Sequence, residues 1–228
     1  MTRKEIKDRL YQLADTEYKS FNDKLIPGVT DTLGVRVPTL RTLAKEISKG
    51  DWRSFTTDDA KSCYEERMLH GMVIGYAKMD LKERFAQLDR FVPLIDNWAV
   101  CDSCCITYQF MKNEQEKSFA YLQKYLRSDA EYEVRFALVS LLDHFINDAY
   151  AGRVLDICNL ISHEGYYVKM AAAWAVSVCV VKYPEQTYTF LENDRMDTFT
   201  HNKAIQKSCE SYRVSPEFKA ALRKLKRK

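Results

Sequence analysis

Apolar residues recur at spacings of three, four and seven along almost the whole chain. One run begins with Ile6, Leu10 and Leu13, and comparable runs lie at 119–126, 154–161 and 218–225. This period places apolar side chains on one face of an α-helix, and no stretch shows the strict alternation of a half-buried strand. The pattern therefore predicts an all-α fold of about a dozen helices.

Prolines mark several predicted helix starts. Pro38, Pro93, Pro184 and Pro216 each stand just before or within the first turn of an apolar-periodic run. Proline suits this position because the N–H group that it lacks would have no partner there. Ser215, which precedes Pro216, is a typical N-cap residue.

Five predicted helices begin at a constant interval. Their first residues are 34 apart: Tyr64, Trp98, Tyr132, Tyr166 and Thr200. Shorter predicted helices lie between them and would form a second layer. A repeat of this size cannot bury its apolar face alone, so stacked repeats must share a continuous core. The sequence therefore predicts a helical repeat solenoid.

A column of apolar or small residues lies five positions behind these starts. It consists of Leu69, Ser103, Ala137, Ala171 and Ile205. Small side chains at such positions allow neighbouring helices to approach closely. We expect neighbouring helices to pack closely at this column.

Composition favours a single repeat domain over residues 1–228. The chain is 46% hydrophobic, and its seven glycines and five prolines form no linker-like stretch. No apolar segment resembles a signal peptide or a membrane span, so we expect a cytoplasmic protein. Its seven cysteines favour reduced, buried thiols over a disulfide framework. Without an evident exposed apolar patch, we expect a monomer.

The formal net charge of +3 is too small to indicate a nucleic-acid partner by itself. A basic run ends the chain, and we interpret it as a solvated helix end. Its members are Lys219, Arg223, Lys224, Lys226, Arg227 and Lys228.

A second column, three positions after the starts, is mostly basic. It holds Arg67, Cys101, Arg135, Lys169 and Lys203. Equivalent positions of a solenoid point the same way, so the four cations would form a ladder that binds the phosphates of double-stranded DNA. In the alternative interpretation, the cations pair with carboxylates on solvated helix starts. The nearby candidates are Glu65, Glu66, Glu131 and Glu133.

The second repeat carries Asp102 where its neighbours are apolar. Trp98 stands four residues earlier and therefore on the same helix face. A carboxylate on an apolar helix face is costly to bury without a partner, so its presence there suggests a functional role. Beside an indole and between basic neighbouring repeats, it is a candidate site for a cationic ligand.

At these residues the chain resembles the AlkD-like DNA alkylation repair proteins, whose HEAT-like repeats wrap duplex DNA. The resemblance extends over essentially the whole chain. It rests on Leu-Gly-Val-Arg-Val-Pro-Thr-Leu-Arg at 33–41, on 98–102, on Arg135, and on Trp174 within 168–176.

The resemblance implies a monofunctional glycosylase that hydrolyses the N-glycosidic bond of cationic N3- or N7-alkylated purines, without flipping the base into a pocket. The family's active residues would fall on Trp98, Trp174, Asp102 and Arg135. Asp102 would stabilise the oxocarbenium-like sugar and orient water. The two tryptophans would pack on sugar and backbone, and Arg135 would hold a phosphate. This chemistry needs no metal or organic cofactor.

The amino-terminal part departs from the family pattern. Family members use a helix before the Leu-Gly-Val turn to hold DNA, whereas residues 20–32 contain Pro27 and Gly28 and show no helical period. We therefore expect no such helix here. The alternative that the chain is a DNA-binding relative with little or no glycosylase activity therefore stays open.

Other site chemistry has weaker support. Cys101, Cys104 and Cys105 lack a second pair or a histidine at zinc-finger spacing, so we expect them in the core.

A protein-interaction scaffold is the remaining alternative function, because a 34-residue helical period also fits tetratricopeptide repeats. The repeats of this chain lack the Trp-x-x-Leu-Gly-x-x-Tyr pattern of tetratricopeptide repeats.

Overall fold

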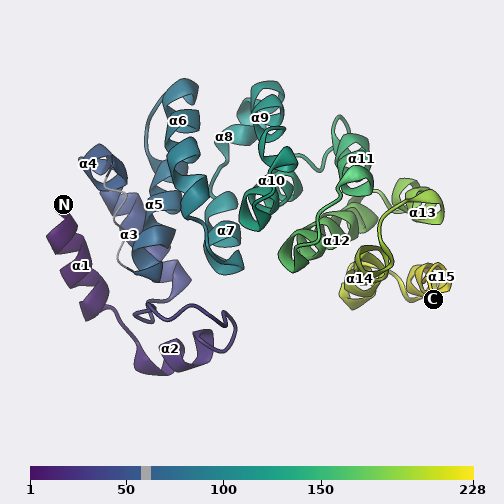
Figure 1. Ribbon diagram of the computed structural model, residues 1–228, viewed down its shortest axis with the longest axis horizontal. Helices are drawn as coiled ribbons and strands as arrows, with labels where there is room; N and C mark the ends of the chain where they lie inside the picture. Colours follow the sequence, from purple (N-terminus) through teal and green to yellow (C-terminus); the bar gives the residue numbers. More distant parts are fainter. Residues whose placement is uncertain (58–62) are drawn as a thin grey trace. The chain divides into compact units, whose positions relative to one another are not determined.

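The computed structural model describes residues 1–57 and 63–228, and within these ranges it contains helices and no strand. Fifteen α-helices and two short 3-10 helices make up its regular structure (Figure 1). The prediction of an all-α helical-repeat fold is confirmed. Contacts divide the chain into two units, Met1–Phe110 and Met111–Lys228. The expectation of one domain over residues 1–228 stays a prediction.

In the first unit, α5 is the central helix and contacts α3, α4, α6 and α7 (Figure 1). Its side chains Met68, Leu69 and Met72 are fully buried, because neighbours surround the helix. The helices of this unit are α1 (Arg3–Gln12), α2 (Thr16–Asn22), α3 (Val37–Ile47), α4 (Trp52–Thr57), α5 (Tyr64–Tyr76), α6 (Leu81–Phe91), η1 (Val92–Leu94) and α7 (Trp98–Cys105).

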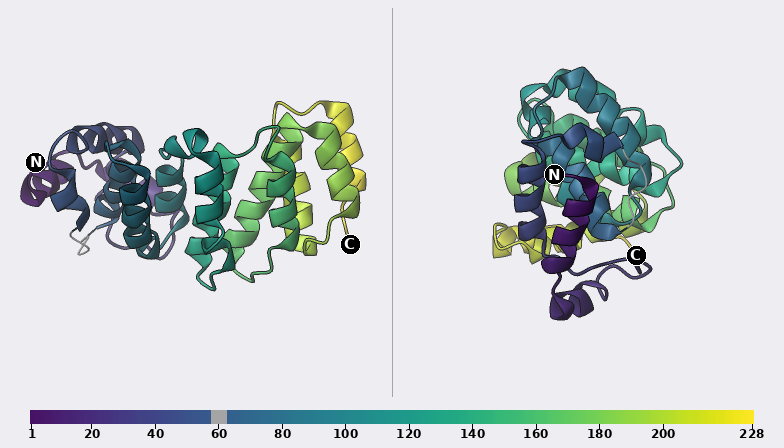
Figure 2. Two further views of the ribbon diagram at one scale, coloured as in Figure 1. Left: turned by 90° about the horizontal axis from the view of Figure 1, so that it is seen from above. Right: turned by 90° about the vertical axis from the view of Figure 1, so that its left-hand side faces the viewer.

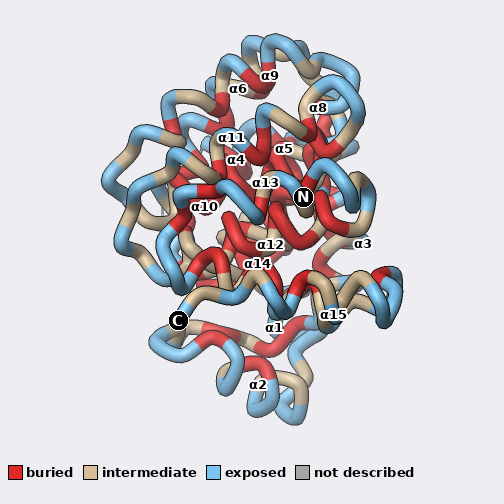
Figure 3. The backbone as a smooth tube through the Cα atoms, turned by 90° about the vertical axis from the view of Figure 1, so that its right-hand side faces the viewer, coloured by how far each residue is buried: buried red, intermediate tan, exposed pale blue. Residues whose placement is uncertain are grey.

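In the second unit, α12 lies between α10 and α14 and also contacts α11 and α13 (Figures 1 and 2). Figure 3 shows α12 largely buried and α15 mostly accessible. A short helix, α8 (Phe110–Asn113), begins at the last residue of the first unit. The others are α9 (Gln115–Leu122), η2 (Tyr125–Arg127), α10 (Glu131–His144), α11 (Ala151–Leu160), α12 (Tyr166–Lys182), α13 (Pro184–Asn193), α14 (Thr198–Glu210) and α15 (Pro216–Lys224).

The predicted helix starts agree with the structure. Pro38, Pro184 and Pro216 occupy the first turns of α3, α13 and α15, and Pro93 lies in η1. Ser215 caps α15, since its hydroxyl oxygen accepts a backbone N–H three residues on at 3.2 Å. These boundaries are local features, which explains why the sequence predicted them.

The 34-residue repeat is present in both units. Tyr64, Trp98 and Tyr166 open α5, α7 and α12, while Tyr132 and Thr200 lie one and two residues inside α10 and α14. Hydrogen bonds join residues about one repeat apart, as expected for stacked repeats. Such bonds link Asp31 with Arg67, Met68 with Cys104, Asp129 with His163, and Asn159 with Arg195.

The column behind the starts is largely buried. Leu69, Ala137, Ala171 and Ile205 are fully buried, and Ser103 is half-buried. Residues with small side chains are therefore found where helices of neighbouring repeats meet.

Two glycines let neighbouring segments approach α5 very closely. A Cβ atom on Gly71 would lie 2.4 Å from both Cys104 Sγ and Phe91 Cζ. A Cβ atom on Gly75 would lie 2.0 Å from Thr107 Oγ1. Neither position has room for a methyl group.

We expect Gly75→Ala to lower the free energy of unfolding by about 1–3 kcal/mol, because overpacking outweighs the better helix propensity of alanine. Urea denaturation measures this change. Gly152→Ala in α11 is the control, since its Cβ would meet only the flexible Gln186 Nε2, at 3.2 Å. A Gly75→Ala variant as stable as wild type would contradict the close packing.

Candidate functional site

Trp98 and Asp102 lie one turn apart on α7. The side-chain oxygen of Asn97 caps this helix by accepting the Val100 N–H at 2.9 Å, which makes Trp98 its first residue. Both site side chains are half-buried on a helix whose other residues are largely enclosed. The indole and the carboxylate are therefore accessible while their backbone is held rigidly.

The segment after α2 supports the indole. Trp98 Nε1 donates a hydrogen bond to the Leu25 carbonyl oxygen at 3.2 Å. The prediction that residues 20–32 form no helix is correct for 23–32 and wrong for 20–22, which complete α2. Contacts made by residues 23–36 hold this non-helical segment in place.

Glu65 anchors this segment to α5. Its carboxylate accepts hydrogen bonds from the backbone N–H groups of Leu33 (2.9 Å), Gly34 (2.8 Å) and Val35 (3.2 Å). Gly34 has a φ of +93°, which helps the three N–H groups converge on one anion. Glu65 is 1% exposed. It binds this turn and does not belong to the carboxylate partners of the basic column.

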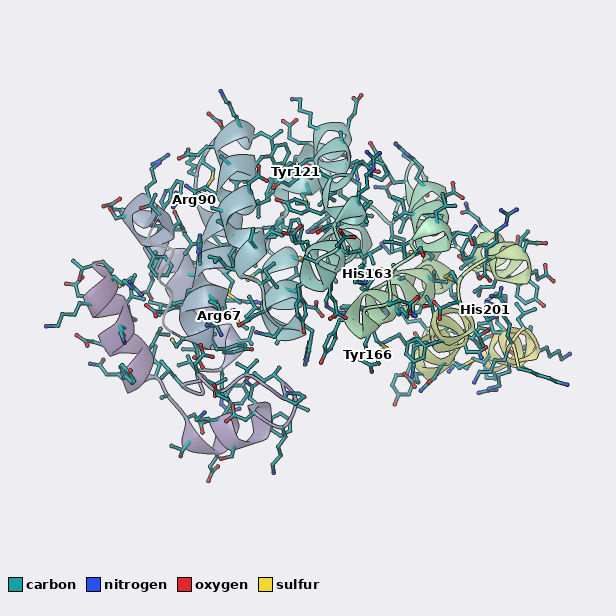
Figure 4. All side chains as sticks on the ribbon, in the orientation of Figure 1. Arg67, Arg90, Tyr121, His163, Tyr166 and His201 are labelled. Atoms are coloured by element: carbon teal, nitrogen blue, oxygen red, sulfur yellow. The ribbon has the colours of Figure 1, made fainter. Side chains whose placement is uncertain are left out.

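Arg67, which is labelled in Figure 4, is paired with carboxylates of its own unit. Its guanidinium group binds Asp31 at 2.6 and 2.9 Å and lies 3.2 Å from Asp96. Burial lowers the pKa of Arg67, but the hydrogen bonds with Asp31 and the charge of Asp96 outweigh it, so the pKa is raised. Its partners are acidic, as in the alternative interpretation, but they are not the predicted glutamates.

The cysteines near Asp102 are core thiols. Cys101, Cys104 and Cys105 are fully buried. Burial raises the pKa of Cys104 well above its ordinary value, and the neighbouring Cys101 and Asp102 add to this. Since a thiol with a raised pKa stays neutral, Cys104 is unsuited to act as a nucleophile or metal ligand.

Arg135 is 5% exposed, and it donates a hydrogen bond to the Tyr167 carbonyl oxygen at 2.8 Å. The carboxylate of Glu131 accepts the Tyr167 N–H at 2.6 Å. Two residues of α10 thus hold the first turn of α12. Arg135 positions the beginning of the helix that carries Trp174.

Trp174 borders a hollow of about 360 Å³ in the second unit. Lys207 and Glu210 of α14, together with Arg213, line the same hollow. Trp174 is half-buried, so part of its ring faces this space. The surroundings combine an aromatic face with two cations and one carboxylate.

Lys169 and Lys203 are less fully neutralised by carboxylates than Arg67 is. Lys169 binds Glu164 at 2.8 Å, and this hydrogen bond raises the pKa of Lys169, although the Glu164 side chain is 96% exposed. Lys169 also borders a hollow of about 250 Å³ with His163 and Arg195. Lys203 binds the neutral amide of Gln206 at 2.9 Å. An ion pair whose acid is almost fully exposed is weak, so a phosphate could replace the Glu164 carboxylate.

The basic tail is partly docked. Arg227 binds the buried Asp194 carboxylate at 3.0 Å, and His201 bridges Asp194 at 2.7 Å and the Leu225 carbonyl oxygen at 2.8 Å (Figure 4). The remaining tail cations Arg223, Lys224, Lys226 and Lys228 are exposed, and Lys219 is half-buried. The end of the chain is therefore fixed to the second unit by Arg227.

The predicted site residues fall into two groups. Trp98, Asp102 and Arg67 belong to the first unit, and Arg135, Lys169, Trp174 and Lys203 belong to the second. The roles predicted for them stay predictions.

Sequence reasoning missed the anchoring role of Glu65 and the cations beside Trp174. The sequence suggests Glu65 only as a partner for the basic column. Lys207 and Arg213 lie outside that column, and no sequence pattern links them with Trp174.

Over residues 1–57 and 63–228, no group of three or more His, Cys, Asp or Glu side chains is arranged to hold a metal ion. Within the same ranges, no helix combines the length and the apolar character that a membrane span requires.

Comparison with known proteins identifies the family. Neither the curated proteins nor the solved structures contain a match to the chain. The model of the family described as DNA alkylation repair enzyme matches residues 6–208, which include both groups of predicted site residues. The chain therefore belongs to the DNA alkylation repair enzyme family.

Proposed function

We propose that the protein is a monofunctional DNA glycosylase that releases cationic N3- or N7-alkylated purines from double-stranded DNA. The observation that carries this proposal is the half-buried Asp102 one helical turn from the half-buried Trp98, in a member of a DNA repair family. An accessible carboxylate beside an indole face suits a ligand on which positive charge develops.

The chemistry needs little more than charge stabilisation. The C1′–N bond of the alkylated purine breaks, and its electron pair leaves with the base, which becomes neutral. Positive charge then develops on the sugar, and water adds to C1′ and loses a proton. Asp102 stabilises that sugar and orients the water. At about 4 Å in a partly dry site, such a carboxylate contributes several kcal/mol.

The other residues bind and position the DNA. Trp98 and Trp174 offer ring faces to the sugar and backbone. Lys169 and Lys203 contact phosphates, since neither is committed to a buried carboxylate. Arg135 and Arg67 belong to the same DNA-binding set, and we propose that they act chiefly by fixing α12 and the segment after α2.

The direct test is base release from methylated duplex DNA. Wild-type protein should release 7-methylguanine or 3-methyladenine faster than the spontaneous rate, without added metal. Release at the spontaneous rate would reject the glycosylase proposal.

A DNA-binding protein with little or no glycosylase activity is the second candidate. One observation favours it: Arg67 is neutralised by Asp31 and Asp96. Both candidates predict duplex binding whose log affinity falls with log salt by roughly 0.9 per phosphate contact. A fluorescence titration at several salt concentrations measures this slope. Absent or salt-insensitive binding would favour a protein-interaction scaffold.

A further inference from the structure

Four aromatic side chains form a continuous row across the second unit. They are contributed by α10, α12 and α14, and we call them the aromatic row: Tyr132, Tyr167, Tyr166 and Phe199. Successive ring centroids are 5.6, 5.2 and 5.9 Å apart. Each ring therefore contacts the next, although the residues come from three different repeats.

The far end of the row is open to solvent. Tyr166 is 55% exposed and Phe199 is 40% exposed, while Tyr132 and Tyr167 are half-buried. Tyr166 lies on the side of α12 that faces away from α11 (Figure 4). Single exposed aromatic residues are common, but adjoining exposed rings from two helices mark a binding surface.

Cations accompany the row along its length. Arg135 lies over the Tyr167 ring at 5.8 Å and Lys203 over the Phe199 ring at 5.7 Å from the centroid. Lys169 follows Tyr166 by three residues, and its ion-pair partner Glu164 is almost fully exposed. The acids nearby are Glu131, Glu164 and Asp197, and each is engaged in a hydrogen bond.

We propose that the aromatic row binds the unpaired bases of single-stranded DNA, with Lys169 and Lys203 at the phosphates. Aromatic faces between cations are how proteins hold single strands, since every base has a face that can stack. The bases of an intact duplex stack on one another and offer no free face to Tyr166 or Phe199. A single strand therefore fits this surface better than a duplex or an uncharged protein segment does.

This inference concerns a form of DNA other than the duplex substrate, and it does not depend on base release. Its test compares an oligothymidylate with an oligonucleotide of equal length made only of abasic sites. Both carry the same phosphates, but only the first has bases. Fluorescence anisotropy at one fixed salt concentration gives the dissociation constants.

Wild-type protein should bind the oligothymidylate about tenfold more tightly than the abasic strand. Tyr166→Ala and Phe199→Ala should each weaken oligothymidylate binding about fivefold or more and leave abasic-strand binding unchanged. Tyr166→Phe should bind like wild type, because it keeps the ring. Melting curves check the fold, which should not change since both side chains are exposed.

Tyr212→Ala is the matched control, since Tyr212 is fully exposed and lies outside the row. Equal wild-type affinity for the two strands would overturn the inference. So would a loss in Tyr212→Ala as large as that in Tyr166→Ala, or a Tyr166→Ala variant that binds oligothymidylate as wild type does.

Discussion

Asp102→Asn is expected to slow the release of alkylated purines by about 10²- to 10³-fold, the range found when one preorganised electrostatic group is removed from an active site. The substitution keeps the size of the side chain and removes its charge. Asparagine cannot neutralise the positive charge that develops on the sugar. Single-turnover base release from methylated duplex DNA measures the chemical step directly.

DNA binding separates this effect from a general loss of affinity. Removing a negative charge should leave binding to unmodified duplex unchanged or slightly tighter, because the phosphates are anionic. Asp156→Asn provides the matched control: Asp156 is exposed on α11, and the change in charge is the same. If Asp102→Asn and wild type released base at equal rates above background, Asp102 would be misassigned.

Glu65→Gln is expected to lower the free energy of unfolding by about 3 kcal/mol, because one buried carboxylate holds three backbone N–H groups. A glutamine amide keeps one acceptor oxygen, but it removes the charge that the three N–H groups share and turns an N–H₂ group toward the Leu33 N–H. The turn at 33–35 should then loosen, and with it the segment that supports Trp98 through Leu25.

Urea denaturation measures the stability, and trypsin cleavage after Lys24 reports the local loosening, since this lysine is exposed in the affected segment. Glu83→Gln is the matched control. Glu83 pairs with Arg53 at the surface, and such a pair is worth about 0–1 kcal/mol. Equal losses in the two variants, or unchanged cleavage in Glu65→Gln, would show that the turn does not depend on this carboxylate.

Patterns among residues close in sequence were enough to predict most of the helices and part of the candidate site. The starts at Tyr64, Trp98 and Tyr166 follow from the local apolar period and from helix caps such as Asn97. The shared face of Trp98 and Asp102 follows from helix geometry alone, since four residues make about one turn. These features depend on the backbone over a few residues.

Tertiary structure decided the partners of each charge. Arg67 and Asp31 are 36 residues apart, and Glu65 lies about 30 residues from the turn that it holds. Arg135 likewise meets the Tyr167 carbonyl only because α10 and α12 pack together. The all-α repeat, the family and the helical positions of the site residues could all be predicted from the amino-acid sequence. Only the stacking of the repeats decided which cations are neutralised and which aromatic rings join into a row, because those contacts form between segments that are brought together by core burial.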